Sequence, residues 1–189
     1  NYTGGGPEPS REELQILKEA ERKGILVVAA AGNEESNIDI KTNKFFPACY
    51  GLKNIISVTA HNKSLKTLPS SNFGKRTVDI SAPGHRIKSA LPFGRAGFLT
   101  GTSQATAFVS GVAAMIKAQF PKVTAKQLKA IIKQSAKKEI TLLTKCSTGG
   151  RLDASKAQKV ALKLFGSKIR TRGLANKSTK GKIIYRYAN

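Results

Sequence analysis

One unbroken apolar run, Ile25-Leu26-Val27-Val28-Ala29-Ala30-Ala31, constrains the fold of this chain more than any other feature. An apolar run without polar alternation is typical of a strand that is buried on both faces, as in a parallel sheet. A segment with helical periodicity, residues 11–23, precedes the run and stops at Gly24. We therefore predict a helix followed by a buried strand, in a sheet covered by helices.

The rest of the chain continues the alternation of helices and strands. Two further strands are predicted over residues 54–60 and 77–82, and a hairpin over residues 86–99. Three helices are predicted over residues 101–120, 124–137 and from 153 to 165. The first of them is rich in small residues, which predicts close packing in a central position. These elements together predict an α/β protein.

The length and composition fit one domain with a hydrophobic core. The chain has 189 residues, of which 40% are hydrophobic. No apolar run approaches the roughly 20 residues that a transmembrane helix needs. The chain does not begin with Met and opens on no signal-like segment, so we expect a processed chain or a fragment. We expect the domain to cover residues 1–165 and to be followed by a basic tail, residues 166–189.

Positive charge is concentrated after the first 39 residues. Residues 1–39 hold eight acids and four bases, whereas residues 40–189 hold 29 bases and three acids. A surface this positive attracts polyanions such as nucleic acid, anionic lipid or acidic polymers. The tail has seven bases and no acid, interleaved with Tyr185 and Tyr187. A weak polyanion site and a merely soluble, solvated surface both fit this pattern.

Two cysteines, Cys49 and Cys146, are too few for a disulfide scaffold or for a CxxC metal site. A single disulfide and two free thiols both remain open.

The segment Gly101-Thr102-Ser103 places a serine at the first turn of a buried helix. The free N–H groups of a helix N-terminus, together with the helix dipole, stabilise an oxyanion that forms beside them. Ser103 is therefore a candidate nucleophile, although a serine at this position can also simply cap the helix.

Asn33 follows the buried apolar run at its carboxyl end. Ligands bind at this edge of open α/β sheets, and an asparagine amide can donate a hydrogen bond to developing negative charge. The alternative is an Asx turn that closes the strand.

Taken together, these segments resemble the subtilisin-like serine proteases, or subtilases. The nucleophile motif of that family is G-T-S-x-A-x-P-H-V-x-G, and residues 101–111 have GTSQATAFVSG. The oxyanion element of the family, A-A-G-N, is matched by residues 30–33. The resemblance spans about residues 1–165 in the family's order, with further matches at residues 46–48, 54–58, 71–74, 78–84 and 149–153.

The resemblance implies a three-layer fold, with a mostly parallel sheet between helices and the N-terminal part of the domain missing. It implies that Ser103 attacks the peptide carbonyl, and that the Asn33 side chain and the Ser103 N–H bind the oxyanion. Peptide or protein substrates would pair with the edge formed by Gly4 and Gly5. One wall of the pocket for the residue before the cut would consist of Ala30, Ala31 and Gly32.

The chain departs from the family pattern in two ways. Ala107 and Phe108 replace a Pro-His pair, which we expect to matter little because that histidine is not catalytic. In the family, the catalytic Asp and His precede the A-A-G-N strand. Neither His61 nor His85 aligns with that catalytic histidine, and both are expected on the surface. We therefore expect an upstream segment to supply the Asp and His, and residues 1–189 alone to be inactive.

An absent upstream segment would also leave an exposed sheet edge and apolar surface. The alternative to a peptidase is an inactive subtilase-like pseudoprotease or a polyanion-binding module.

Three smaller expectations complete the prediction. Phe45 stands where the family often has a small residue at the floor of its specificity pocket, and either fills that pocket or packs elsewhere. No cofactor is required for the chemistry, although family members bind structural Ca²⁺, often through carbonyls near residues 46–50; no acidic cluster identifies such a site here, so no metal ligand is assigned. By resemblance alone, the protein is expected to be secreted.

Overall fold

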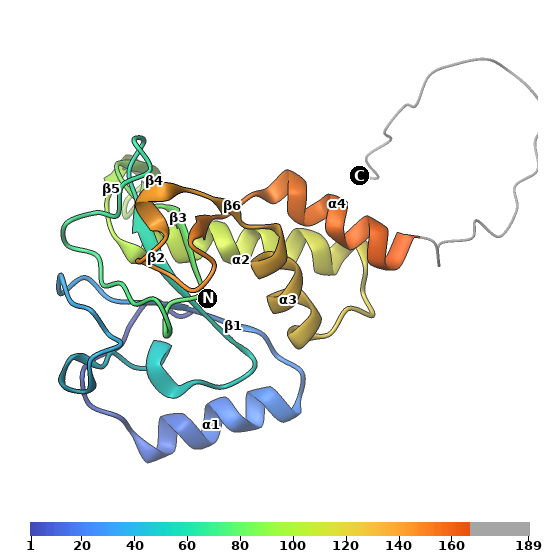
Figure 1. Cartoon of the computed structure of the whole chain (residues 1–189), viewed down its shortest axis with the longest axis horizontal. Helices are drawn as coiled ribbons and strands as arrows, with labels where there is room; N and C mark the ends of the chain where they lie inside the picture. The colour runs from blue at the N-terminus through green and yellow to red at the C-terminus, as the bar shows by residue number, and fades with distance from the viewer. Residues whose placement is uncertain (167–189) are drawn as a thin grey trace, which may run out of the picture.

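The fold is built around one five-stranded sheet (Figure 1). It was obtained as a computed structural model, and it describes residues 1–166; the expectations for the basic tail therefore lie outside the described residues, apart from Gly166. The strand order is β1-β2-β3-β7-β6. The strands are β1 (Val27–Ala30), β2 (Ile55–His61), β3 (Ile80–Pro83), β6 (Lys137–Lys138) and β7 (Gly150–Arg151).

The sheet is mostly parallel, as predicted. Val27 pairs with Ile55 and Val58 with Ile80, so β1, β2 and β3 run in the same direction. Strand β7 continues the parallel order beside β3, and β6 pairs with β7 in the antiparallel sense. All residues of β1 and β2 are buried, because helices cover both faces of the sheet.

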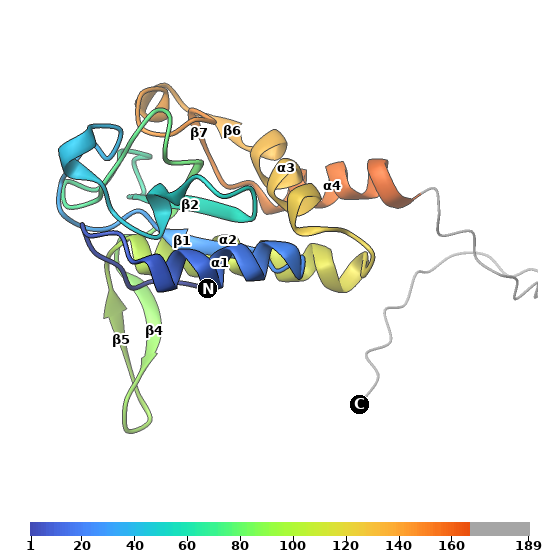
Figure 2. The same ribbon diagram turned by 90° about the horizontal axis from the view of Figure 1, so that it is seen from below.

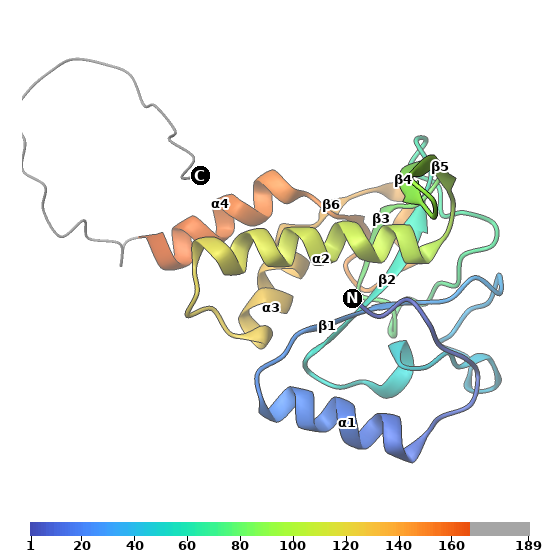
Figure 3. The ribbon, with the colours of Figure 1, turned by 180° about the vertical axis from the view of Figure 1, so that it is seen from behind.

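Helices cover the two faces of the sheet in a three-layer arrangement (Figures 1 and 3). On one face, Leu17 of α1 (Arg11–Arg22) joins the cluster that contains Val27 and Ala29. On the other, the side chains of Val28 and Ile56 pack against α2 (Thr102–Gln119). Helices α3 (Ala125–Ser135) and α4 (Ala154–Phe165) extend this second layer. The alternation of side chains along the strands thus separates the two cores.

The predicted strand at residues 77–82 begins only at Ile80. The backbone N–H of Thr77 donates to the Asp39 carboxylate at 2.8 Å, and that of Val78 donates to the Gly74 carbonyl at 3.1 Å. Because these donors are used within a turn, residues 77 and 78 lie outside the sheet.

The predicted hairpin is confirmed as β4 (Ile87–Leu91) and β5 (Arg95–Leu99), which pair in the antiparallel sense. It projects away from the sheet (Figure 2). Three short 3₁₀ helices, η1 (Lys41–Asn43), η2 (Ala48–Tyr50) and η3 (Ile140–Leu142), complete the elements of the described residues.

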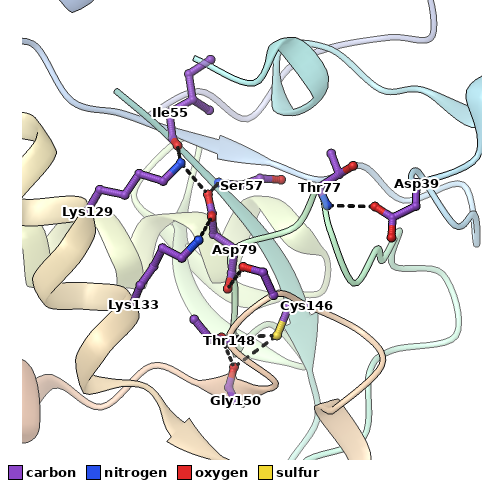
Figure 4. Close-up of polar contacts among 11 residues, drawn as sticks. Asp39, Ile55, Ser57, Thr77, Asp79, Lys129, Lys133, Cys146, Thr148 and Gly150 are labelled. Carbon is purple, nitrogen blue, oxygen red and sulfur yellow. Dashed lines mark hydrogen bonds and ion pairs between the residues drawn. The ribbon is translucent and has the colours of Figure 1, made fainter. Parts of the chain in front are cut away.

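A buried carboxylate, Asp79, ties helix α3 to the sheet (Figure 4). Its oxygens accept hydrogen bonds from Lys133 Nζ at 2.6 Å and from the Ser57 N–H at 3.1 Å, and Lys129 Nζ lies 3.0 Å away. Lys129 also donates to the Ile55 carbonyl. Asp79 is thus a structural residue at the amino end of β3, because each of its charge partners comes from α3.

Both cysteines are free thiols in the structure. The Sγ atom of Cys146 is buried, and it lies 3.5 Å from both the Thr148 hydroxyl and the Gly150 carbonyl (Figure 4). Burial raises the pKa of the half-buried Cys49 thiol. Of the two possibilities left open by the sequence, the structure has the free thiols.

The expectation that His61 lies on the surface is wrong. It is the last residue of β2, only 4% exposed, and its Nδ1 lies 2.8 Å from the Ser81 hydroxyl. The pKa of His61 is lowered to about 4 from its ordinary value of 6.5, and burial of the ring is the largest cause. The positive charge of Arg151 contributes to this lowering of the pKa, and the negative charge of Glu139 opposes it.

We predict that His61 destabilises the fold at acidic pH. Its folded pKa lies below the unfolded value, so its contribution to the free energy of unfolding is complete above about pH 6.5 and is lost as pH falls toward about 4. The full loss is about 3 kcal/mol. Urea unfolding at pH 7 and pH 4.5 measures it, and His61→Gln should lose less stability between the two pH values than the wild type.

His85→Gln is the matched control, because His85 is exposed. This variant should keep the pH dependence of the wild type. An equal pH dependence in His61→Gln and the wild type would contradict the prediction.

No helix within residues 1–166 combines the length and the apolar character that crossing a bilayer requires.

Candidate active site

The loop after β1 and the N-terminus of α2 meet at one point of the structure. The Oδ1 atom of Asn33 accepts hydrogen bonds from the Thr102 backbone N–H at 3.0 Å and from its hydroxyl at 3.2 Å. The same hydroxyl lies 3.3 Å from the Gly32 carbonyl. Asn33 and Thr102, which are 69 positions apart in the sequence, are thereby held together. Ser103 directly follows Thr102, so this contact brings Asn33 close to Ser103.

These contacts fix the orientation of the Asn33 carboxamide. Both Thr102 groups are donors, so the oxygen of the amide must face them, and the Nδ2 donor points elsewhere. Asn33 is exposed, so its Nδ2 group is accessible to a ligand.

Ser103 is the second residue of α2 and is half-buried. A helix N-terminus has N–H groups without intrahelical acceptors, and that of Thr102 is taken by Asn33. The N–H groups of Ser103 and Gln104 remain free within the described residues. The N-terminus of α2 therefore combines the Ser103 hydroxyl, free N–H donors and the positive end of the helix dipole.

Gly101 permits the close approach of the two segments. Its φ is +150°, and a methyl group on its Cα would lie 3.3 Å from Asn33 Oδ1. A side chain at residue 101 would therefore press against the Asn33 carboxamide.

Asn72, which no sequence pattern singles out as a site residue, holds the loop that carries Asn33. Its side chain is 1% exposed, accepts from the Glu34 N–H at 3.0 Å and donates to the Ala31 carbonyl at 2.9 Å. Its backbone N–H donates to the Gly32 carbonyl. Residue 72 belongs to a segment that resembles the family, but no spacing in the sequence indicates that it hydrogen-bonds to the backbone both before and after Asn33.

Gly4 and Gly5 lie on an exposed strip between two anchored residues. Tyr2 is hydrogen-bonded to Val28 and Ala30 of β1, and Gly6 forms a bridge with Phe46. Gly4 and Gly5 are exposed, and no backbone hydrogen bond of either is found within residues 1–166. The strip thus presents free peptide groups beside the end of β1.

Ala30 and Ala31 are buried, with exposures of 1% and 0%, as is Gly32. Gly32, with φ +101°, is the residue of this segment that comes directly before Asn33. The structure therefore brings Gly4, Gly5, Gly32, Asn33 and Ser103 to the carboxyl end of β1.

Neither His61 nor His85 is placed to act as a base for Ser103 in the described residues. His61 is bound to Ser81 in the interior, and His85 is exposed in the turn after β3. The described residues contain no hydrogen bond between either ring and the Ser103 hydroxyl.

An open apolar groove of about 460 Å³ lies beside Ser103, between α2 and β4. Phe108 and Met115 line it with exposures of 43% and 39%. Strand β1 forms one edge of the sheet, and Tyr2 pairs with its outer side through hydrogen bonds to Val28 and Ala30. The expected apolar surface is present in this groove. The edge of β1 is not exposed, because its residues are buried and its outer backbone groups are hydrogen-bonded to Tyr2.

The loop around residues 46–50 has no acidic side chain that would hold Ca²⁺. The carbonyls of Phe45, Phe46 and Pro47 accept hydrogen bonds from backbone N–H groups. The Lys44 ammonium lies in the same loop and donates to the Ile38 carbonyl at 3.0 Å. Residues 1–166 contain no cluster of three or more His, Cys, Asp or Glu side chains that could bind a metal ion.

Comparison with known proteins identifies the family. The profile of the subtilase family matches residues 1–167, which is most of the chain. The chain belongs to the subtilase family. Subtilases are serine peptidases whose chemistry needs no cofactor, and the fold described above, an α/β fold with a mostly parallel sheet between helices, is the fold of this family.

Several subtilases are similar over part of their length. The chain is 39% identical over 113 residues to the "Major intracellular serine protease" of Bacillus subtilis (strain 168), covering 60% of the chain and 34% of that protein. It is 38% identical over 136 residues to "Subtilisin NAT" of Bacillus subtilis subsp. natto, covering 72% of the chain and 35% of that protein. The chain thus spans about a third of the length of these relatives.

One solved subtilase structure is similar to most of this chain, and the chain again covers only part of that protein. The structure described as "Structural basis of subtilase cytotoxin SubAB assembly" superposes with a TM-score of 0.77 and 31% identity, over 90% of this chain and 60% of that chain.

The expectation of secretion is wrong. It rested on family resemblance alone, and one of these similar subtilases is an intracellular serine protease. Membership of the family therefore does not indicate export.

Proposed function

We propose that this chain supplies the nucleophile and the oxyanion hole of a subtilisin-like serine endopeptidase. The observation that supports this proposal best is the pair of hydrogen bonds from Thr102 to Asn33 Oδ1. They hold the Asn33 amide beside the helix mouth and leave its Nδ2 free to donate.

In the proposed reaction, the Ser103 hydroxyl attacks the peptide carbonyl and gives its proton to a histidine. The carbonyl oxygen becomes an oxyanion, which accepts hydrogen bonds from Asn33 Nδ2 and the Ser103 N–H. The protonated histidine then gives the proton to the leaving amine, and an acyl ester remains on Ser103. Water hydrolyses the ester by the same two steps.

The histidine and its aspartate are proposed to come from a segment that precedes residue 1. A serine without a base is a weak nucleophile at neutral pH, and both histidines of the chain are placed for other contacts or for solvent. Residues 1–165 would then be the C-terminal part of the catalytic domain, and residues 166–189 a separate basic tail. The groove beside Ser103 is a surface that the upstream segment could cover.

Peptide or protein substrates are proposed to bind in an extended conformation. The free peptide groups of Gly4 and Gly5 can pair with substrate backbone by strand addition. Gly32 and the two alanines before it would form one wall of the pocket for the residue before the cut.

A fluorophosphonate probe, which reacts with activated serines, tests the proposal. The intact protein, with the residues that precede Asn1, should be labelled, and peptide mapping should place the label on Ser103. Residues 1–189 alone should remain unlabelled, because the base is absent. Label on another serine, or none on the intact protein, would contradict the proposal.

The second candidate is an inactive subtilase-like protein that binds polyanions. It is favoured by the 29 bases and three acids of residues 40–189. If the intact protein is unlabelled yet elutes from heparin only at high salt, with a steep salt dependence, this function replaces the first.

A further inference from the structure

We infer that Phe45 occupies the pocket for the substrate residue before the cut, and that the protein therefore selects small side chains, glycine or alanine, at that position. This inference rests on the proposed peptidase function and adds the class of substrate to it.

The ring of Phe45 spans the gap between two segments of the site. A methyl group on Gly5 would lie 2.7 Å from Phe45 Cε1, and one on Gly32 would lie 2.9 Å from Phe45 Cδ2. Cε1 and Cδ2 are opposite corners of the phenyl ring. One edge of the ring therefore lies against the strip at Gly5 and the other against the loop at Gly32.

Both glycines are required by this packing. Gly5 has φ +147° and Gly32 has φ +101°, so any other residue would be strained there. Because neither glycine has a side chain, the space between the two segments is available, and the Phe45 ring takes it.

This space is where the substrate side chain would go. The carbonyl under attack must lie beside Asn33 and Ser103, and the α-carbon that bears the side chain is one bond away from it. Gly32 directly precedes Asn33, and Gly5 lies on the strip proposed to pair with substrate backbone. A side chain longer than a methyl group would therefore meet the Phe45 ring.

The backbone of Phe45 is held in place. Its N–H donates to Cys49 Sγ at 3.3 Å, and its carbonyl accepts from the Cys49 N–H at 2.9 Å. The next residue, Phe46, forms the bridge to Gly6. These contacts hold the backbone of Phe45 and of the residue after it, so the side-chain rotation of Phe45 sets where its ring lies.

Peptide libraries that vary only the residue before the cut test this inference on the intact protein. The wild type should cleave the alanine peptide with a higher kcat/KM than the phenylalanine peptide. Phe45→Ala should raise the ratio of phenylalanine to alanine cleavage by about 10- to 100-fold, because the vacated space can bury an aromatic side chain. The ratio is independent of the fraction of active enzyme, so partial unfolding of the variant does not alter it.

Phe93→Ala is the matched control, since Phe93 is 92% exposed in the β4–β5 turn. It should leave the ratio unchanged. Phe45→Val, a smaller truncation, should give an intermediate ratio. An unchanged ratio in Phe45→Ala, or a wild type that prefers phenylalanine, would overturn the inference.

Failure of the proposed function is distinguishable from these outcomes. In that case no peptide is cleaved and the fluorophosphonate does not label Ser103. An enzyme that is labelled and active but shows an unchanged ratio overturns the assignment of Phe45 alone.

Discussion

Ser103→Ala should reduce kcat for peptide hydrolysis by the intact protein by about 10⁴-fold or more, with little change in KM. The variant lacks the hydroxyl proposed to form the acyl ester, whereas the Asn33 amide and the helix N–H groups proposed to bind the carbonyl remain. Substrate binding should therefore persist while the chemistry stops. Steady-state kinetics with a chromogenic peptide measure the effect.

Ser155→Ala is the control, because Ser155 is exposed on helix α4 and does not line the groove beside Ser103. We expect less than about a twofold change in this variant, as for most substitutions away from reacting atoms. Hydrolysis that persists in Ser103→Ala would show that another group is the nucleophile.

Asn33→Ala should reduce kcat by about 10²- to 10³-fold, a loss of about 2.7–4 kcal/mol of transition-state stabilisation. This magnitude was measured in a member of the same family, and its transfer to this chain is the prediction. KM should change little, because the hydrogen bond from Nδ2 reaches full strength only when the carbonyl oxygen becomes an oxyanion.

Asn33→Asp separates the donor from the structural role of the residue. An aspartate oxygen can still accept from the two Thr102 donors, so the helix mouth should stay in place. The variant lacks Nδ2 and adds negative charge, and its kcat should fall at least as far as that of Asn33→Ala. Asn43→Ala, in the 3₁₀ helix η1, should behave as the wild type. Near-normal kcat in Asn33→Asp would remove Asn33 from the oxyanion hole.

Much of the fold could be predicted from local patterns. The continuous apolar run around Val28 predicts a strand with two covered faces, and α1 on one side and α2 on the other do cover it. The hairpin at residues 87–99 follows from its turn signals. The strand predicted over residues 77–82 includes Thr77, yet the Asp39 carboxylate, far away in the sequence, accepts the Thr77 N–H and keeps it out of the sheet.

Local sequence patterns do not predict which polar residues are buried in this protein. His61 was expected on the surface, since a lone histidine usually is solvated, but Ser81 provides a buried partner 20 residues away. Asn72 was recognised only as part of a family segment, although it holds the loop at Gly32 from both sides. In each case the partner is distant in the sequence, and no local pattern records it.

The sequence alone determined the family, the order of the elements and the identity of the candidate nucleophile and amide, because these depend on residue types at short spacing. The tertiary structure alone decided how they face one another. It set the Asn33 oxygen against Thr102 and the Phe45 ring between Gly5 and Gly32. Such contacts depend on where the sheet and helices bring distant backbone segments, and packing over the whole domain fixes that arrangement.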